Sequence, residues 1–347
     1  MSKVRVLIVD DSATIRRLLT GILARDPDIE VVGEAPEPHT ARAMIKSLNP
    51  DVLTLDVEMP GMSGLEFLDR IMRLRPMPVV MVSSATERGA EVTLDALAIG
   101  AVDYFAKPSG NVAAGLDAAA MELIRKVKTA ATAKARAHSS THAAHPVADM
   151  HFSDRVIAIG SSTGGVEALI EVLSCFPANC PPTVITQHMP AGFTTSFAAR
   201  LDKICAPHVC EAVDGAVLAP GHVFLAPGST AHLEVTGRAQ LSCRLVDGDL
   251  DGGHRPSVDR LFQSLARYAG PKAVGVILTG MGRDGTDGLC AMRAAGADTI
   301  GQDEATATVY GMPRAAFEAG AVARQLPLEK IGPEVLRLCR QAHLQEA

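Results

Sequence analysis

The sequence predicts an α/β protein of two domains, and three observations support this. The chain has 347 residues, whereas a single domain usually has roughly 100–200. Short apolar runs alternate with stretches of helical spacing in two separate parts of the chain. Between these parts the composition shifts to Ala, Ser, Thr and His. We therefore expect a first domain over residues 1–125, a linker over 126–152 and a second domain over 153–347.

Five segments of the first part have the pattern of short buried strands. In chain order they are VRVLIVD, IEVVGEA, PDVLTLD, PVVMVSS and AVDYFAKP. The first, third and fourth are almost wholly apolar, as expected of parallel strands that helices cover on both faces. The stretches between them have helical spacing and the length of crossover connections. The sequence therefore predicts an open, doubly wound sheet of five strands.

A second α/β pattern begins at Arg155. RVIAIG, PTVITQHM and AVGVILTG have the pattern of buried strands, and each is followed by a glycine-rich loop and a helix. Between the second and the third lie four shorter β-like pieces, HVCEAV, HVFLAP, HLEVTG and AQLSCRLV. We therefore predict a doubly wound, mainly parallel sheet with a small antiparallel extension.

Composition and charge argue against several classes of protein. Aromatic residues make up only 3% of the chain, which disfavours base stacking on single-stranded nucleic acid. The net charge of −6 disfavours a basic surface for nucleic acid. No apolar run reaches the roughly 18 residues of a membrane span, so we expect no membrane insertion. The seven cysteines lack C-x-x-C spacing and the chain enters a strand directly, so we expect reduced thiols in a cytoplasmic protein.

Acidic residues gather at the carboxyl edge of the first predicted sheet. Asp10 and Asp11 end the first strand, and Asp56 ends the third. Three carboxylates at this edge repel one another unless a cation lies among them, and Mg²⁺ prefers such oxygen ligands. Lys107, at the end of the fifth strand, adds a positive charge for a phosphate, so that a carboxylate here can attack a phosphoryl donor. Helix capping, the alternative, explains one acid but not their convergence.

The motifs VDDS, LDVEMPGMSG, VSSAT and YFAKP resemble the receiver domain of two-component response regulators. The resemblance covers about residues 3–125 and implies a flavodoxin-like (CheY-like) fold with five parallel strands and phosphorylation at Asp56. It implies a Mg²⁺ site whose ligands are Asp10, Asp11, Asp56 and the backbone of Glu58. It also implies a phosphorylation switch that consists of the hydroxyl of Ser83, the aromatic ring of Tyr104 and the phosphate contact Lys107.

A glycine-rich turn follows the first strand of the second domain. In RVIAIGSSTGGVEALIEVL, Ser162 lies between a strand and a helix, and the neighbouring glycines permit a sharp turn. GSSTG fits the nucleophile elbow G-x-S-x-G. A phosphate cradle is the alternative, but the spacing G-x-x-x-G-G differs from the dinucleotide fingerprint, and no acid follows where a ribose needs one.

Two further residues decide between these interpretations. His188 follows the strand PTVITQHM, and Asp284 lies in the glycine-rich loop after AVGVILTG. Taken alone, such a histidine is most often structural and such an aspartate is usually a turn former. Together with Ser162, however, they reach the same edge of one sheet. We therefore predict a Ser-His-Asp triad, in a chain order unlike that of the familiar serine hydrolases.

The segment HRPSVD, residues 254–259, allows two interpretations. His254 and Arg255 are candidates for the wall of a substrate groove. Pro256, Ser257 and Asp259 are typical of a helix start, which we favour.

The motifs IGSSTGGVEAL, TQHMPAGFTTSFAARLD, GHRPSVDRLF and VGVILTGMGRDGTDGL resemble the chemotaxis protein-glutamate methylesterases of the CheB type. With the receiver and the linker, the resemblance covers nearly the whole chain. It implies hydrolysis of glutamate γ-methyl esters, and deamidation of certain glutamines, with no cofactor for the ester chemistry. It implies a catalytic site of Ser162, His188 and Asp284, with the backbone N–H of Met281 in the oxyanion hole and Thr163 nearby.

The resemblance also implies partners. Methyl-accepting chemoreceptors are the expected substrate, and a chemotaxis histidine kinase is the expected phosphodonor. No nucleic-acid partner is expected. The alternative function is a response regulator with a non-catalytic binding output such as DNA binding, which the acidic charge and the lack of helix-turn-helix spacing disfavour.

Overall fold

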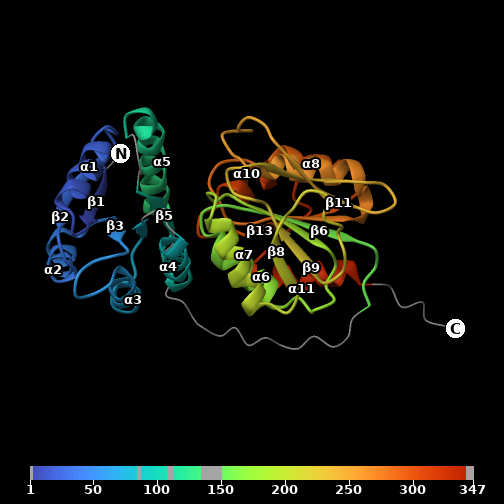
Figure 1. Ribbon diagram of the computed structural model, residues 1–347, viewed down its shortest axis with the longest axis horizontal. Coiled ribbons are helices and arrows are strands. Elements are labelled where there is room, and N and C mark those ends of the chain that lie inside the picture. Colours follow the sequence, from blue (N-terminus) through green and yellow to red (C-terminus); the bar gives the residue numbers. More distant parts are fainter. Residues whose placement is uncertain (1–2, 84–86, 108–111, 134–150, 341–347) are drawn as a thin grey trace. The chain divides into compact units, whose positions relative to one another are not determined.

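The computed structural model describes residues 3–83, 87–107, 112–133 and 151–340 (Figure 1). The chain divides into two compact units, Met1–Ser140 and Thr141–Ala347. Each unit has its own parallel sheet. Within the described ranges, no helix combines the length and apolar character needed to cross a membrane.

The first unit has a five-stranded sheet in the order β2-β1-β3-β4-β5, and all pairs are parallel. The strands are β1 Val4–Val9, β2 Ile29–Ala35, β3 Val52–Asp56, β4 Val79–Ser83 and β5 Asp103–Ala106. All five predicted strands are therefore present, and the flavodoxin-like fold is confirmed. The strand order reverses between β1 and β3, so a ligand site is expected at their carboxyl ends.

Helices cover this sheet on both faces (Figure 1). They are α1 Ala13–Leu23, α2 Pro38–Leu48, α3 Gly64–Leu74, α4 Glu87–Ile99 and α5 Val112–Thr132. The core on the α1 and α5 side joins Leu19 and Leu123 to Val6 of β1. Helix α5 continues past residue 126, where we expected the linker to begin, because Val127 belongs to the same core. The rest of the expected linker, 134–150, lies outside the described residues.

The second unit has a seven-stranded sheet in the order β14-β13-β12-β6-β7-β9-β8, again with all pairs parallel. Its strands are β6 Val156–Ser161, β7 Thr183–Gln187, β8 His208–Glu211, β9 His222–Leu225, β12 Ala273–Ile277, β13 Asp298–Gln302 and β14 Arg324–Leu326. The three predicted buried strands are the three central ones. The chain winds outward from β6 on one side and from β12 on the other, so this sheet also has a switch point.

A separate antiparallel ribbon, β10 His232–Thr236 and β11 Ser242–Val246, completes the unit. The predicted small antiparallel extension is therefore confirmed, but it contains only two of the four β-like pieces. HVCEAV and HVFLAP instead form β8 and β9 of the parallel sheet. The connection between β8 and β9 is long enough to return the chain to the same end of the sheet, so the two strands run parallel. Val223 of β9 is fully buried.

In the part of the second unit that the structure describes, six α-helices and one 3₁₀ turn surround the sheet. They are α6 Gly165–Ser174, α7 Phe193–Ile204, α8 Val258–Tyr268, η1 Gly270–Lys272, α9 Thr286–Ala294, α10 Met312–Glu318 and α11 Leu328–Cys339. Helix α8 buries Val258, Leu261 and Phe262 in the core. A Cβ at Gly160 of β6 would lie 2.2 Å from Val258 Cγ1, so glycine permits the close approach of α8 to the sheet. This approach places the start of α8 beside the end of β6.

Candidate functional site

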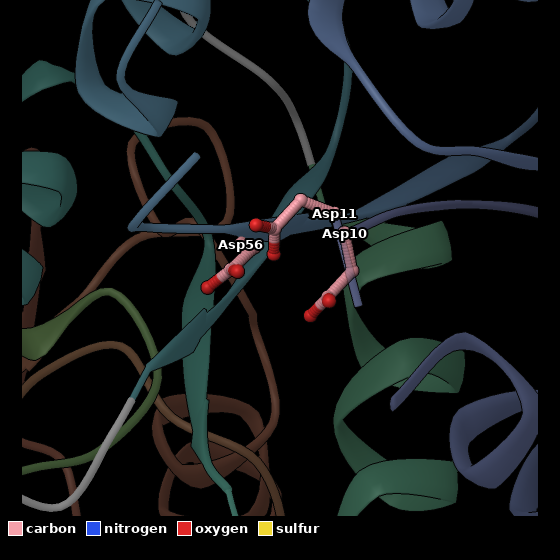
Figure 2. Close-up of side chains that lie close together, drawn as sticks. All are labelled: Asp10, Asp11 and Asp56. Carbon is pink, nitrogen blue, oxygen red and sulfur yellow. The ribbon is translucent and has the colours of Figure 1, made fainter. Parts of the chain in front are cut away.

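Three carboxylates gather at the switch point of the first unit. Oxygen atoms of Asp10, Asp11 and Asp56 lie within 4.8 Å of one another (Figure 2). Asp10 and Asp11 follow β1, and Asp56 ends β3. Asp10 and Asp56 are buried and Asp11 is exposed, so the cluster opens to solvent on the Asp11 side. It borders an open cavity of about 680 Å³ that Glu58 and Lys107 also line.

Lys107 bridges two of these carboxylates. Its Nζ lies 2.9 Å from Asp56 Oδ1 and 3.0 Å from Asp10 Oδ2. Burial raises the pKa of Asp56 to about 6, although Lys107 opposes the rise. Burial also disfavours the charge on Lys107, but its bonds to Asp56 and Asp10 outweigh this effect and raise its pKa. One ammonium among three carboxylates leaves the cluster acidic, and this all-oxygen donor set fits Mg²⁺.

The other predicted receiver residues surround this cluster. The backbone N–H of Glu58 donates to Asp56 Oδ1 at 3.3 Å. Ser83 ends β4, and its hydroxyl donates to the carbonyl of Gly89 in α4 at 3.2 Å. Tyr104 of β5 is buried, and Lys126 Nζ of α5 lies 4.5 Å from its ring centroid. Burial, aided by neighbouring acids, holds the pKa of Tyr104 well above its usual value. Ser83 and Tyr104 thus connect strand ends to α4 and α5.

In the second unit, Ser162 lies at the tight turn between β6 and α6. Its N–H donates to the carbonyl of Thr279 at 3.0 Å, and its carbonyl accepts from Gly165 N at 2.7 Å. Gly164 has a φ of 77°, a conformation that favours glycine. These backbone bonds fix the position of Ser162 at the carboxyl edge of the sheet, beside the switch point.

A buried polar network supports this turn. Ser161 Oγ donates to Gln187 Oε1 at 2.6 Å, and Gln187 Nε2 donates to the carbonyl of Ser162 at 3.0 Å. Thr279 Oγ1 donates to the carbonyl of Thr163 at 2.9 Å. Thr163, the next residue after Ser162, is buried.

His188 follows β7, next to β6 in the sheet, and its N–H donates to the carbonyl of Ser161 at 3.0 Å. Its Nε2 lies 2.7 Å from Asp284 Oδ2, and the His188 side chain is only 9% exposed. The other ring nitrogen, Nδ1, is buried and has no hydrogen-bond partner in the part of the chain that the structure describes. Because Nε2 carries a proton and donates a hydrogen bond to Asp284, Nδ1 of the neutral ring is an acceptor. The ring therefore presents a base at the edge where Ser162 lies.

Asp284 accepts three further hydrogen bonds from the start of α8. Val258 N donates to Oδ2 at 2.8 Å, and Asp259 N and Ser257 Oγ each donate to Oδ1 at 3.0 Å. The first N–H groups of a helix lack partners within the helix, so the carboxylate satisfies them. Burial opposes the charge, but the bonds from His188 and α8 hold the pKa of Asp284 well below its usual range.

The HRPSVD segment starts helix α8 and also contacts His188 and Asp284. Ser257 is the N-cap of α8, so the predicted helix start is confirmed. Arg255 donates to the carbonyl of Gly248 at 2.7 Å and to that of Ser229 at 3.1 Å. The ring of His254 lies flat on that of His188. The bond from Ser257 to Asp284 and this ring contact join distant parts of the chain, so no sequence pattern signalled them.

The peptide between Gly280 and Met281 lies against Ser162. The carbonyl of Gly280 accepts from Gly311 N at 3.1 Å and from Met312 N at 2.8 Å. In a trans peptide the N–H points opposite to the carbonyl, so the N–H of Met281 points away from those donors. A Cβ on Gly280 would lie 2.8 Å from Ser162 Cβ, so only glycine permits this approach.

Comparison with known proteins gives the family. A response regulator receiver domain model matches residues 6–120, and a CheB methylesterase model matches residues 157–335. This chain belongs to the CheB methylesterase family. The match to the second domain favours the esterase over the non-catalytic binding output that we considered.

CheB relatives match over almost the whole length. The protein-glutamate methylesterase/protein-glutamine glutaminase 1 of Caulobacter vibrioides is 60% identical over 341 residues, which are 97% of this chain and 98% of the relative. The protein-glutamate methylesterase/protein-glutamine glutaminase of Agrobacterium fabrum is 58% identical, covering 96% of each chain. The crystal structure of the Thermotoga maritima CheB methylesterase catalytic domain has 38% identity and a TM-score of 0.52, and covers 54% of this chain and 99% of that chain.

Proposed function

We propose that this CheB-family chain is a phosphorylation-regulated esterase that hydrolyses glutamate γ-methyl esters on chemoreceptors. Ser162 is the nucleophile, His188 the general base and Asp284 the residue that orients the base. One observation carries the assignment: His188 is held to Asp284 through Nε2, and its buried Nδ1 is left as an acceptor beside the Ser162 turn.

The reaction follows from these positions. His188 Nδ1 takes the proton of Ser162 Oγ, which attacks the ester carbonyl. The N–H of Met281 stabilises the developing oxyanion. The C–O bond to methanol then breaks, and His188 returns the proton to the leaving methanol. Water attacks the acyl-enzyme by the same route in reverse, and Asp284 stabilises the imidazolium in both halves of the reaction.

The same acyl chemistry accounts for a second substrate, a receptor glutamine. Attack on its side-chain amide releases ammonia in place of methanol and gives the same glutamyl-enzyme. The names of the Caulobacter and Agrobacterium relatives include both activities, which supports this part of the proposal.

The receiver unit supplies the regulation. Asp56 accepts a phosphoryl group from a chemotaxis histidine kinase, and Lys107 contacts that group. Mg²⁺ fits among Asp10, Asp11, Asp56 and the backbone of Glu58, and when bound it offsets the charge of the phosphoryl oxygens. When Asp56 is phosphorylated, Ser83 and Tyr104 change position and move the helices that they contact, α4 and α5. The proposed location is cytoplasmic, which the seven unpaired cysteines support.

Replacing Ser162 with Ala tests the nucleophile. We expect methanol release from a methyl-esterified receptor preparation to fall by roughly 10⁴–10⁶, because the substitution removes the proposed nucleophile. Ser174→Ala is the matched control, since Ser174 lies at the far end of α6 and bonds only locally, to Glu171 O at 2.7 Å. A Ser162→Ala variant with normal turnover and a normal thermal midpoint would contradict the proposal.

A further inference from the structure

His254, the first residue of the HRPSVD segment, stacks on the ring of His188. The two ring centroids lie 3.9 Å apart, and the ring planes differ by 1°. At this separation and angle, the face of one ring lies against the face of the other. His254 itself comes from the loop before α8, far from β7 in the sequence.

The backbone of His254 is held firmly. Its N–H donates to the carbonyl of Asp251 at 2.9 Å, and its carbonyl accepts from Asp251 N at 3.0 Å. The next residue, Arg255, is anchored to Gly248 O and Ser229 O. The side chain of His254 is half-buried. These hydrogen bonds therefore anchor the backbone that carries the ring.

Asp284 alone cannot fix the plane of His188. A single hydrogen bond at Nε2 holds one edge of the ring but leaves the ring able to tilt about that bond. A flat ring against the face of His188 removes this freedom. We propose that His254 is a positioning residue that fixes the plane of His188, so that Nδ1 stays directed at Ser162; this rests on the proposed function.

From the sequence, we also considered His254 as part of the wall of a substrate groove. A positioning role and a groove-wall role predict different kinetic effects when His254 is replaced. A groove wall contacts the receptor, so its loss raises KM for the receptor and leaves a small ester unaffected. Loss of positioning lowers kcat by the same factor for any ester, because the base is misplaced whatever is bound.

The experiment compares His254→Ala, His254→Phe and His254→Leu on two substrates, a methyl-esterified receptor preparation and a short peptide with one glutamate γ-methyl ester. We expect His254→Ala to lower kcat roughly 10- to 100-fold on both substrates, with KM changed less than about twofold. Phe, which has a flat ring, restores most of kcat, whereas Leu, which has similar bulk and no ring, does not. His208→Ala is the control, because His208 is exposed on β8 and bonds to Asp202.

Three results would overturn the inference: full kcat in His254→Ala, a defect confined to KM for the receptor, or a Phe variant no better than Leu. If the Ala variant does not fold, as judged by circular dichroism, the comparison of Phe with Leu decides. Ser162→Ala is measured in parallel. If the wild-type chain releases no methanol, the proposed function fails; if it does and the His254 variants match it, only this inference fails.

Discussion

Asp284 combines two tasks at one pair of oxygens. Its Oδ2 accepts from His188 and Val258, and its Oδ1 accepts from Ser257 and Asp259. Asp284 therefore holds both His188, the proposed base, and the start of α8, which the end of the HRPSVD segment forms. Because every acceptor position faces a donor, the side chain needs two equivalent oxygens and a negative charge.

Asp284→Asn should impair both tasks. Either orientation of the amide turns its NH₂ group toward N–H donors, so we expect kcat to fall roughly 10³–10⁴-fold and stability to fall by about 1–3 kcal/mol. Turnover and urea unfolding measure the two effects. Asp287→Asn, on the exposed side of α9 and paired with Arg283, is the control and should change neither.

Acid should erase the stability difference between the wild type and Asp284→Asn. The folded pKa of Asp284 lies below its ordinary value of 3.8. Its stabilising contribution is therefore complete above that value and is lost as the pH falls through the folded pKa. Urea midpoints should converge as the pH falls from about 4 toward the folded pKa of Asp284. A gap that widens below about pH 4 would contradict this assignment.

At the scale of elements, an aspartate at the start of each of the helices α8 and α9 accepts hydrogen bonds from the start of the other helix. Asp284 precedes α9 and accepts from the start of α8, while Asp259 in the first turn of α8 accepts from Gly288 N of α9 at 2.6 Å. A Cβ on Gly288 would lie 2.6 Å from the carbonyl of Asp259, so glycine permits the close contact. Each carboxylate satisfies N–H groups at the positive end of the other helix. These bonds fix the start of α8 against the sheet edge where the proposed catalytic residues lie.

Asp259→Asn and Asp259→Ala should separate charge from hydrogen bonding. Burial raises the pKa of Asp259 to about 6, and the nearby Asp284 adds to the rise. The folded state then holds a proton that the unfolded state releases, so this residue makes wild-type stability fall as the pH rises from about 4 to about 6. Asn keeps the acceptor without the charge and should gain about 1–2 kcal/mol relative to wild type over that range. Ala lacks the acceptor as well as the charge, so the Ala variant should be about 1 kcal/mol less stable than the Asn variant at every pH.

Urea unfolding at pH 4, 6 and 8 measures this comparison. The Asn variant should show a flatter dependence of stability on pH than the wild type. An Asn variant with the wild-type pH dependence would show that Asp259 does not titrate in this range.

At the scale of the whole molecule, two units with separate cores use the same topological device. Each has a parallel sheet whose strand order reverses, and each places its reactive side chains at the carboxyl ends of strands beside the reversal. In the first unit the groups are acids and a lysine suited to a cation and a phosphoryl group. In the second they are a hydroxyl, an imidazole and a carboxylate suited to acyl transfer.

Phosphorylation should couple the two units. We expect Mg²⁺ with acetyl phosphate, a small phosphodonor, to raise methanol release by the full chain about 5–150-fold, the usual range of coupling between sites. The Asp56→Asn variant should keep the basal rate of methanol release, but acetyl phosphate should no longer increase that rate. Asp69→Asn is the control, because Asp69 of α3 pairs with Arg73 and should still be activated. EDTA should remove the rise and leave the basal rate; loss of the basal rate would contradict a metal-free triad.

Local pattern decided much of this protein in advance. The eight principal strands, the turn at Ser162 and the convergence of both reactive clusters followed from the sequence, because buried parallel strands are continuous apolar runs whose carboxyl ends share an edge. The sequence pattern did not indicate β13, whose segment DTIGQ mixes polar and apolar residues, or the edge strand β14, which has only three residues. It also left open the direction of β8 and β9, which depends on how their connection crosses the sheet.

The tertiary structure alone decided which atoms meet at the site. Asp284 binds Nε2 of His188 and leaves Nδ1 as an acceptor. The start of α8 supplies three donors to Asp284, and His254 stacks on His188. All of these contacts join segments that are distant in the sequence. Side-chain type and spacing determine which chemistry is available at a strand end. The packing of α8 on β6 determines the orientation of each group, because orientation depends on neighbours that the local sequence does not contain.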